Sequence, residues 1–110
     1  MSIVYIPQEP RKRDDDGGWK PLYDLTPAVR FGSLEILLPH GPMLLDTGVV
    51  MAELKEKLKH FTVDDFIMLI GDPSAIAATV LVASQISGGN IKVLKYDRAE
   101  RQYNSVNLKF

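Results

Sequence analysis

The stretch Phe66–Ile70 constrains the fold more than any other part of the sequence, because its residues, FIMLI, are all apolar. Continuous rather than alternating hydrophobicity is typical of a strand that is buried on both faces. The sequence GDPS follows directly and predicts a helix from about residue 74 to residue 86, with Asp72 as N-cap and Pro73 at the first helical position. Gly88 and its neighbouring glycine predict the end of this helix. We therefore expect a buried strand that leads into a helix, as in α/β proteins.

Three further strands and one further helix are predicted. Residues 34–38, 91–96 and 102–110 have the composition of strands, and the last of them alternates apolar and polar side chains. Between residues 50 and 61, apolar side chains recur at three- and four-residue steps, which predicts a helix that Asp46 or Thr47 caps. The predicted fold class is a small two-layer α/β domain with the order β-α-β-α-β-β, a mixed sheet and a C-terminal antiparallel hairpin.

Residues 1–20 differ from this pattern, and we predict a flexible N-terminal arm there, with residues 21–110 as a single α/β domain. A short β-prone run, residues 3–6, is followed by Pro7 and Pro10 and then by RKRDDDGG, which carries three charges of each sign and two glycines. Such a segment cannot be buried cheaply. We therefore interpret it as a mobile linker, which proteases should cut first.

Composition excludes several function classes. The length of 110 residues fits one domain, and 13 basic against 14 acidic residues give no overall attraction to nucleic acid or to anionic membranes. The absence of cysteine excludes disulfides and thiolate chemistry. No apolar stretch is long enough to span a membrane, and the N-terminal residues lack the charge order of a signal peptide. We expect no membrane association.

The strand-to-helix turn is the first candidate site, with Gly71, Asp72, Ser74 and Ala75 as candidate ligand-binding residues. Ligands of open α/β sheets favour the carboxyl ends of strands, and a helix N-terminus attracts anions. The alternative interpretation is structural: Asp72 caps the helix, and Gly71 permits the tight turn. The turn lacks the GxGxxG pattern and the P-loop lysine, and Asp72 would repel a phosphate.

No catalytic constellation is recognisable. His40 and His60 have no second histidine nearby, and Asp64-Asp65 is interpreted as a solvated cap. No serine lies in a GxSxG elbow. We therefore predict a protein that is not an enzyme, with no catalytic residues, no metal and no cofactor.

The final hairpin combines basic and aromatic residues, a combination that can bind single-stranded nucleic acid. These residues are Lys92, Lys95, Arg98 and Arg101, with Tyr96 and Tyr103 beside them. Asp97 and Glu100 interrupt the basic strip, so we expect cross-strand ion pairs and weak nucleic-acid binding or none.

The second predicted helix is unusually apolar, since only Thr79 is polar between Ala75 and Ala83. A surface helix ordinarily shows a broad polar face. The apolar face could be covered by residues of the same chain or by a second copy, and we favour a homodimer. The predicted interface residues are Thr79, Val80, Val82 and Ala83.

Several segments together resemble a group of small proteins of tailed bacteriophages, over roughly residues 21–110. The resemblance is carried by LYDLTP at residues 22–27, FTVDDF at 61–66, GDPSAIAA at 71–78 and KVLKYDRAERQY at 92–103. It implies action in the cytoplasm of an infected host or in a virion, and it transfers no functional residue. We therefore expect a non-enzymatic phage accessory protein that binds another macromolecule, a host or phage protein, and self-associates. The alternatives are a small-ligand or anion-binding module at residues 71–75, and then a weak nucleic-acid binder.

Overall fold

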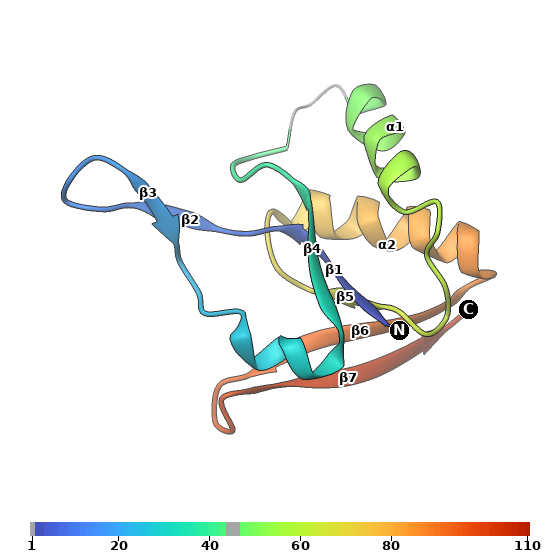
Figure 1. Cartoon of the computed structure of the whole chain (residues 1–110). Coiled ribbons are helices and arrows are strands. Elements are labelled where there is room, and N and C mark those ends of the chain that lie inside the picture. Colours follow the sequence, from blue (N-terminus) through green and yellow to red (C-terminus); the bar gives the residue numbers. More distant parts are fainter. Residues whose placement is uncertain (1, 44–46) are drawn as a thin grey trace.

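A five-stranded sheet forms the centre of the molecule (Figure 1), as seen in a computed structural model that describes residues 2–43 and 47–110. The strand order is β4-β1-β5-β6-β7. The first four of these strands are parallel, and β7 runs antiparallel to β6. The strands are β1 (Ile3–Gln8), β4 (Ser33–Leu38), β5 (Phe66–Met68), β6 (Asn90–Asp97) and β7 (Gln102–Lys109). The predicted fold class, an α/β domain with a mixed sheet and a C-terminal antiparallel hairpin, is confirmed.

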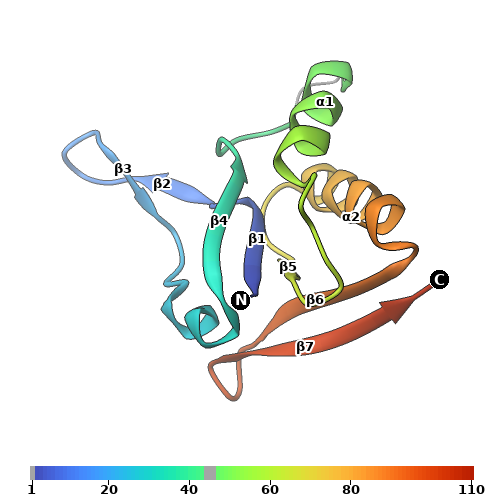
Figure 2. The same ribbon diagram turned by 45° about the vertical axis from the view of Figure 1, so that its right-hand side comes forward.

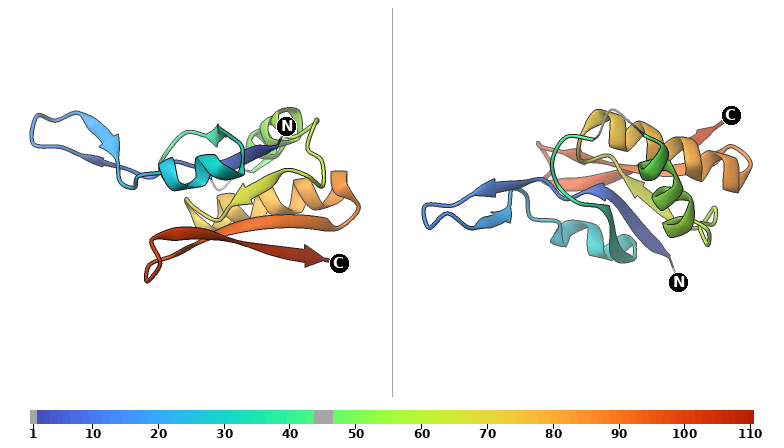
Figure 3. Two further views of the ribbon diagram at one scale, coloured as in Figure 1. Left: turned by 60° about the horizontal axis from the view of Figure 1, so that its bottom comes forward. Right: turned by 90° about the horizontal axis from the view of Figure 1, so that it is seen from above.

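The two helices lie on one face of the sheet, and a 3-10 helix covers part of the other (Figures 2 and 3). The helices are α1 (Gly48–Lys57) and α2 (Pro73–Ser87), and the 3-10 helix is η1 (Thr26–Phe31). A separate two-stranded hairpin, β2 (Arg11–Arg13) and β3 (Trp19–Pro21), projects from the sheet between β1 and η1. The hairpin and η1 together connect β1 to the parallel strand β4.

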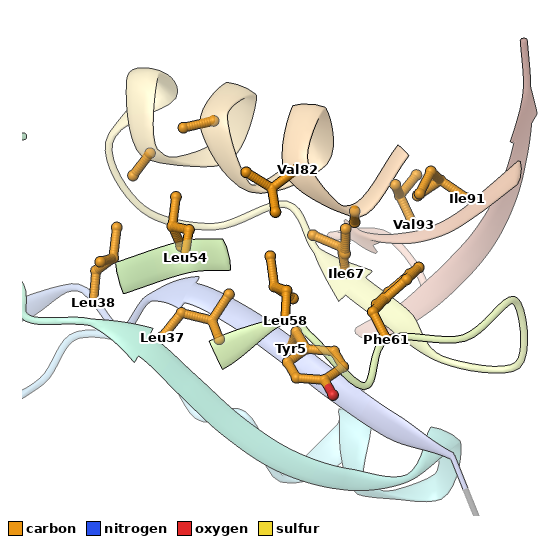
Figure 4. Packing of buried hydrophobic residues seen from close by; sticks show 13 residues of the cluster. Tyr5, Leu37, Leu38, Leu54, Leu58, Phe61, Ile67, Val82, Ile91 and Val93 are labelled. Carbon is orange, nitrogen blue, oxygen red and sulfur yellow. The ribbon is translucent and has the colours of Figure 1, made fainter. Parts of the chain in front are cut away.

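Two apolar clusters hold these layers together. The larger one lies between the sheet and the helices, where Leu54 of α1 and Val82 of α2 pack over Tyr5 and Ile67 (Figure 4). The smaller one lies under η1 and contains Met68 with other residues of both the sheet and the η1 segment. Adjacent residues of β5 thus enter opposite clusters. The prediction that this strand is buried on both faces is confirmed, although the strand ends at Met68, before Ile70.

The structure corrects the prediction for the start of the chain. We expected residues 1–20 to lie outside the domain, but Ile3–Gln8 is a central strand that pairs with β4 on one side and β5 on the other. Pro7 is accommodated because pairing with β5 ends at Tyr5↔Ile67, so no strand partner requires a proline N–H there. Pro10 and the charged run led us to extend the linker over a strand that is mostly buried. We predicted mobility for residues 8–18; Gln8 is instead a buried residue of β1, and the mobility of the rest stays a prediction.

The predicted helix signals are confirmed for α2 and only in part for α1. Asp72 caps α2 by accepting a hydrogen bond from the Ser74 N–H at 2.8 Å, and Gly88 ends the helix in the left-handed conformation at φ 69°. Thr47 precedes α1 but makes no capping hydrogen bond through its side chain. The other predicted cap, Asp46, lies outside the described residues.

Candidate functional site

The carboxyl edge of the parallel strands is held together by one buried side chain, Gln8 at the end of β1. Its amide oxygen accepts the N–H of Asp72 at 2.7 Å. Its amide nitrogen donates to the carbonyl of Pro39 at 2.9 Å and to that of Gly41 at 2.7 Å. Chain connections leave β1 and its neighbour β5 in opposite directions, so this edge is the switch point at which open α/β sheets commonly bind ligands. In this protein, Gln8 links the loop that follows β4 to the turn that precedes α2.

The predicted ligand-binding residues at the strand-to-helix turn have structural partners. Both carboxylate oxygens of Asp72 are in use, one with the Ser74 N–H and the other with the Met43 N–H at 3.3 Å. These two backbone donors, that of Ser74 first, hold the pKa of Asp72 below its usual value. Gly71 adopts φ 118° and lies so close to Gln8 that a Cβ would come within 2.8 Å of the Gln8 Cβ. Ala75 is fully buried. The turn therefore matches the structural interpretation, in which Asp72 caps the helix and Gly71 permits the tight turn.

The predicted interface on α2 requires a correction. Thr79, Val82 and Ala83 are at most 1% exposed, and they pack inside the same chain. The Thr79 hydroxyl donates to the carbonyl of Ala75 at 2.8 Å, so this polar side chain needs no outside partner. Val80 is partly buried against the same core. The apolar residue that α2 leaves exposed near its middle is Leu81, which was not among the predicted interface residues.

The histidines and the paired carboxylates also have identifiable surroundings. The His40 ring lies 4.6 Å from the ring of Trp19, between centroids, which joins the β2–β3 hairpin to the loop after β4. His60 is exposed just beyond α1. The two carboxylates differ: Asp64 is exposed as predicted, whereas Asp65 is buried and was wrongly interpreted as solvated. Asp65 accepts hydrogen bonds from the N–H groups of Ile3 and Thr62.

A larger candidate site is lined by residues of the β6–β7 hairpin and of the segment that leads into η1, two parts of the chain that lie close together in Figure 1. It is a pocket of about 810 Å³ at the carboxyl ends of β5 and β6. Leu69 and Ile70, which follow β5, form part of its wall together with Pro27. The remaining lining consists of three tyrosines, three basic side chains and one carboxylate. These are Tyr23, Tyr96, Tyr103, Lys95, Arg98, Arg101 and Asp24.

The tyrosines of this pocket differ in exposure. Tyr96 and Tyr23 are about half exposed, whereas Tyr103 is 4% exposed. The ring of Tyr103 supports that of Tyr96 edge-on, at 5.1 Å between centroids. Burial raises the pKa of the Tyr103 phenol, and Tyr96 and Asp24 add smaller contributions in the same direction. Tyr103 therefore keeps its proton to a higher pH than an exposed tyrosine does, and Tyr96 presents a half-exposed ring at the pocket.

The charges of the hairpin are arranged differently from our prediction. We expected cross-strand ion pairs, but within the described residues the side chains of Lys95, Arg98 and Arg101 form neither an ion pair nor a hydrogen bond. Asp97 instead stabilises the turn by accepting the N–H groups of Ala99 and Glu100. The basic side chains of the pocket are thus left without an internal counterion.

A second hollow, of about 650 Å³, lies on the same face beside the outer strand β4. Half-exposed apolar side chains border it, among them Leu22, Val29 and Ile36. Tyr23 and Asp24 line both hollows, so the two adjoin. No local sequence pattern marks these residues as a site, because they belong to separate segments that only the fold brings together.

Among residues 2–43 and 47–110, no group of three histidine, aspartate or glutamate side chains is close enough to hold a metal ion. Over the same ranges, no helix has both the length and the apolar character needed to cross a membrane.

Comparison with known proteins identifies the family. Neither the curated proteins nor the solved structures contain a match. One family model does match, that of the Phage Pam3 gp32-like protein, and it covers residues 2–110. This coverage extends over the central strand β1 as well as the segments that carried the sequence resemblance to phage proteins. The chain therefore belongs to the family of Phage Pam3 gp32-like proteins.

Proposed function

We propose that the protein is a non-enzymatic phage accessory protein that acts by binding macromolecules, and that one of these is a second copy of itself. Membership of a phage protein family supports the accessory role. The observation that carries the self-association is the free edge of β4. This strand ends the sheet on one side, and no strand among residues 2–43 and 47–110 pairs with its outer backbone groups.

The sequence of β4 has little of the usual protection of an edge strand, since Glu35 is its one charged residue. Natural edge strands are blunted by lysine, proline or bulges, since an open edge invites another strand. Ser33–Leu38 reads SLEILL, with neither lysine nor proline, and its register with β1 is regular. Ile36 is 44% exposed beside the apolar hollow. Antiparallel pairing of two β4 edges about a two-fold axis would extend the sheet and cover Ile36 in both copies.

Sedimentation velocity at micromolar concentrations tests this proposal. We expect the wild-type protein to sediment as a dimer and Ile36→Lys to sediment as a monomer with unchanged thermal unfolding, because this half-exposed position tolerates a charge in the monomer. Leu81→Lys is the matched control, since it places the same charge on an exposed apolar residue of α2. We expect this variant to remain dimeric.

Two outcomes would contradict the proposal. A wild-type protein that is monomeric at every concentration would remove self-association. Dissociation by Leu81→Lys but not by Ile36→Lys would place the interface on α2. The alternative function, an anion site at residues 71–75, has weaker support, because the N–H groups of Asp72 and Ser74 already donate to Gln8 and Asp72.

A further inference from the structure

We propose that the pocket beside the β6–β7 turn binds a nucleotide unit, with the base stacked on Tyr96 and the phosphate held by Arg98 and Arg101. This inference goes beyond the proposed self-association and uses different residues. The proposed ligand is an aromatic base linked to a phosphate, which a free nucleotide or a single-stranded nucleic acid could supply.

The position of the pocket favours a ligand. It lies at the carboxyl ends of the parallel strands β5 and β6, the edge at which α/β sheets bind ligands. Its volume of about 810 Å³ is within the usual range for small-molecule sites. The neighbouring part of this edge is closed by the hydrogen bonds of Gln8, so the open space lies toward β6.

The lining supplies both parts of the recognition. Tyr96 is 48% exposed and is supported from behind by Tyr103, which leaves a ring surface on which a base can stack. The three basic side chains of the pocket have no internal counterion, whereas its one carboxylate, Asp24, is held by the N–H of Thr26 at 2.9 Å. The lining is therefore net positive, as a phosphate requires.

The backbone at Arg101 supports this assignment. Among the described residues, Arg101 is the one residue other than glycine with a positive φ, 52°. Glycine or asparagine commonly takes this conformation, which is unfavourable for other residues. Here the turn carries an arginine instead, and its side chain lines the pocket. Strained positions of this kind are concentrated at binding sites.

Fluorescence titration of the full chain tests the proposal with three probes: thymidine monophosphate, a short oligothymidylate and inorganic phosphate. We expect the oligonucleotide to bind with a dissociation constant weaker than about 1 µM at physiological salt, as is typical of binding without sequence preference. Tyr96→Ala should weaken binding by about tenfold through loss of stacking. Arg101→Gly should weaken it and lower the salt dependence by about one unit of slope in log affinity against log salt.

The variants distinguish weaker binding that is caused by a lost contact from weaker binding that is caused by unfolding. Arg101→Gly relieves the positive φ, so we expect its thermal unfolding temperature not to fall while binding weakens. Lys55→Gln, on α1 across the sheet, is the control and should bind like wild type. Tighter binding of the oligonucleotide than of the monophosphate indicates a single strand as the source, and equal binding indicates a free nucleotide.

Three results would overturn the proposal. One is the absence of binding by any probe at millimolar concentration. Another is binding of inorganic phosphate as tightly as of the monophosphate, with no effect of Tyr96→Ala. The third is equal weakening by Lys55→Gln and Arg101→Gly. The substituted residues are separate from the proposed dimer edge, because Tyr96 belongs to β6 and Arg101 to the β6–β7 turn, and β1 and β5 lie between β6 and β4.

Discussion

The side-chain oxygen of Gln8 accepts the backbone N–H of Asp72 at 2.7 Å, across 64 positions of the chain. This bond joins the end of the first strand to the start of α2. Because the same amide also donates to two carbonyls of the loop after β4, one residue fixes three connections at the carboxyl edge.

Replacing Gln8 tests its importance for stability. Gln8→Ala leaves one N–H and two carbonyls without their partner, and we expect it to lower the free energy of unfolding by about 3 kcal/mol. Gln85→Ala, on the exposed side of α2, is the control and should change it by less than about 0.5 kcal/mol. Urea denaturation measures both values. Equal effects of the two variants would show that the hydrogen bonds of Gln8 contribute little.

Substitutions at two glycines distinguish the energetic cost of an unfavourable backbone conformation from the cost of a close contact. Gly71 and Gly88 both have positive φ, but a Cβ at Gly71 would meet Gln8 at 2.8 Å, whereas Gly88 faces open space. We expect Gly88→Ala to cost about 1 kcal/mol, from conformation alone. Gly71→Ala should cost about 3 kcal/mol, because the clash adds to the strain. Similar unfolding midpoints for the two variants would contradict the close approach at Gly71.

Asp65 and Asp64 form a matched pair of adjacent carboxylates. Asp65 is buried and accepts the N–H of Ile3 at 2.9 Å and that of Thr62 at 2.8 Å. We expect Asp65→Ala to lower the free energy of unfolding by about 3 kcal/mol, since charged acceptors make strong hydrogen bonds. Asp64→Ala should change it by less than about 0.5 kcal/mol, because this side chain is exposed. Thermal or urea unfolding that ranks the two in the opposite order would refute this assignment.

The stability contributed by Asp72 depends on pH. The Ser74 and Met43 N–H groups hold the pKa of Asp72 below its usual value in the folded protein. Its contribution is therefore complete above the unfolded pKa of about 3.9 and is lost as the pH falls through the lower folded pKa. We expect the wild type to be more stable than Asp72→Asn at neutral pH, and the difference to shrink toward pH 2. Urea midpoints at several pH values measure this difference, and a constant difference would argue against the ionised cap.

Sequence patterns could predict those elements whose signals are local. Asp72, Pro73 and Gly88 mark the ends of α2, and the apolar run at 66–70 indicates a strand buried on both faces. The first strand could not be recognised in this way, because Pro7 argues against a central strand in general. It fits here only because β5 is too short to pair with it.

The candidate pocket was only partly predictable. Tyr96, Arg98 and Arg101 were noticed as a strip of basic and aromatic residues. Whether their charges are paired depends on the orientation of Asp97, which the turn determines. Tyr23 reaches the same pocket from a segment more than seventy residues away, and no local pattern signals that contact. For α2, apolar composition did not distinguish burial within the chain from burial between copies.

The central place of β1 has a consequence for folding during synthesis. Ile3 is made long before Asp65, which lies 62 positions later, and before the strand that flanks β1 on that side. Until β5 leaves the ribosome, β1 lacks one of its two neighbouring strands. Such long sequence separations slow folding, since loop closure precedes the gain from contact. The nascent chain therefore exposes apolar side chains of β1 until β5 has been synthesised and can pair with it.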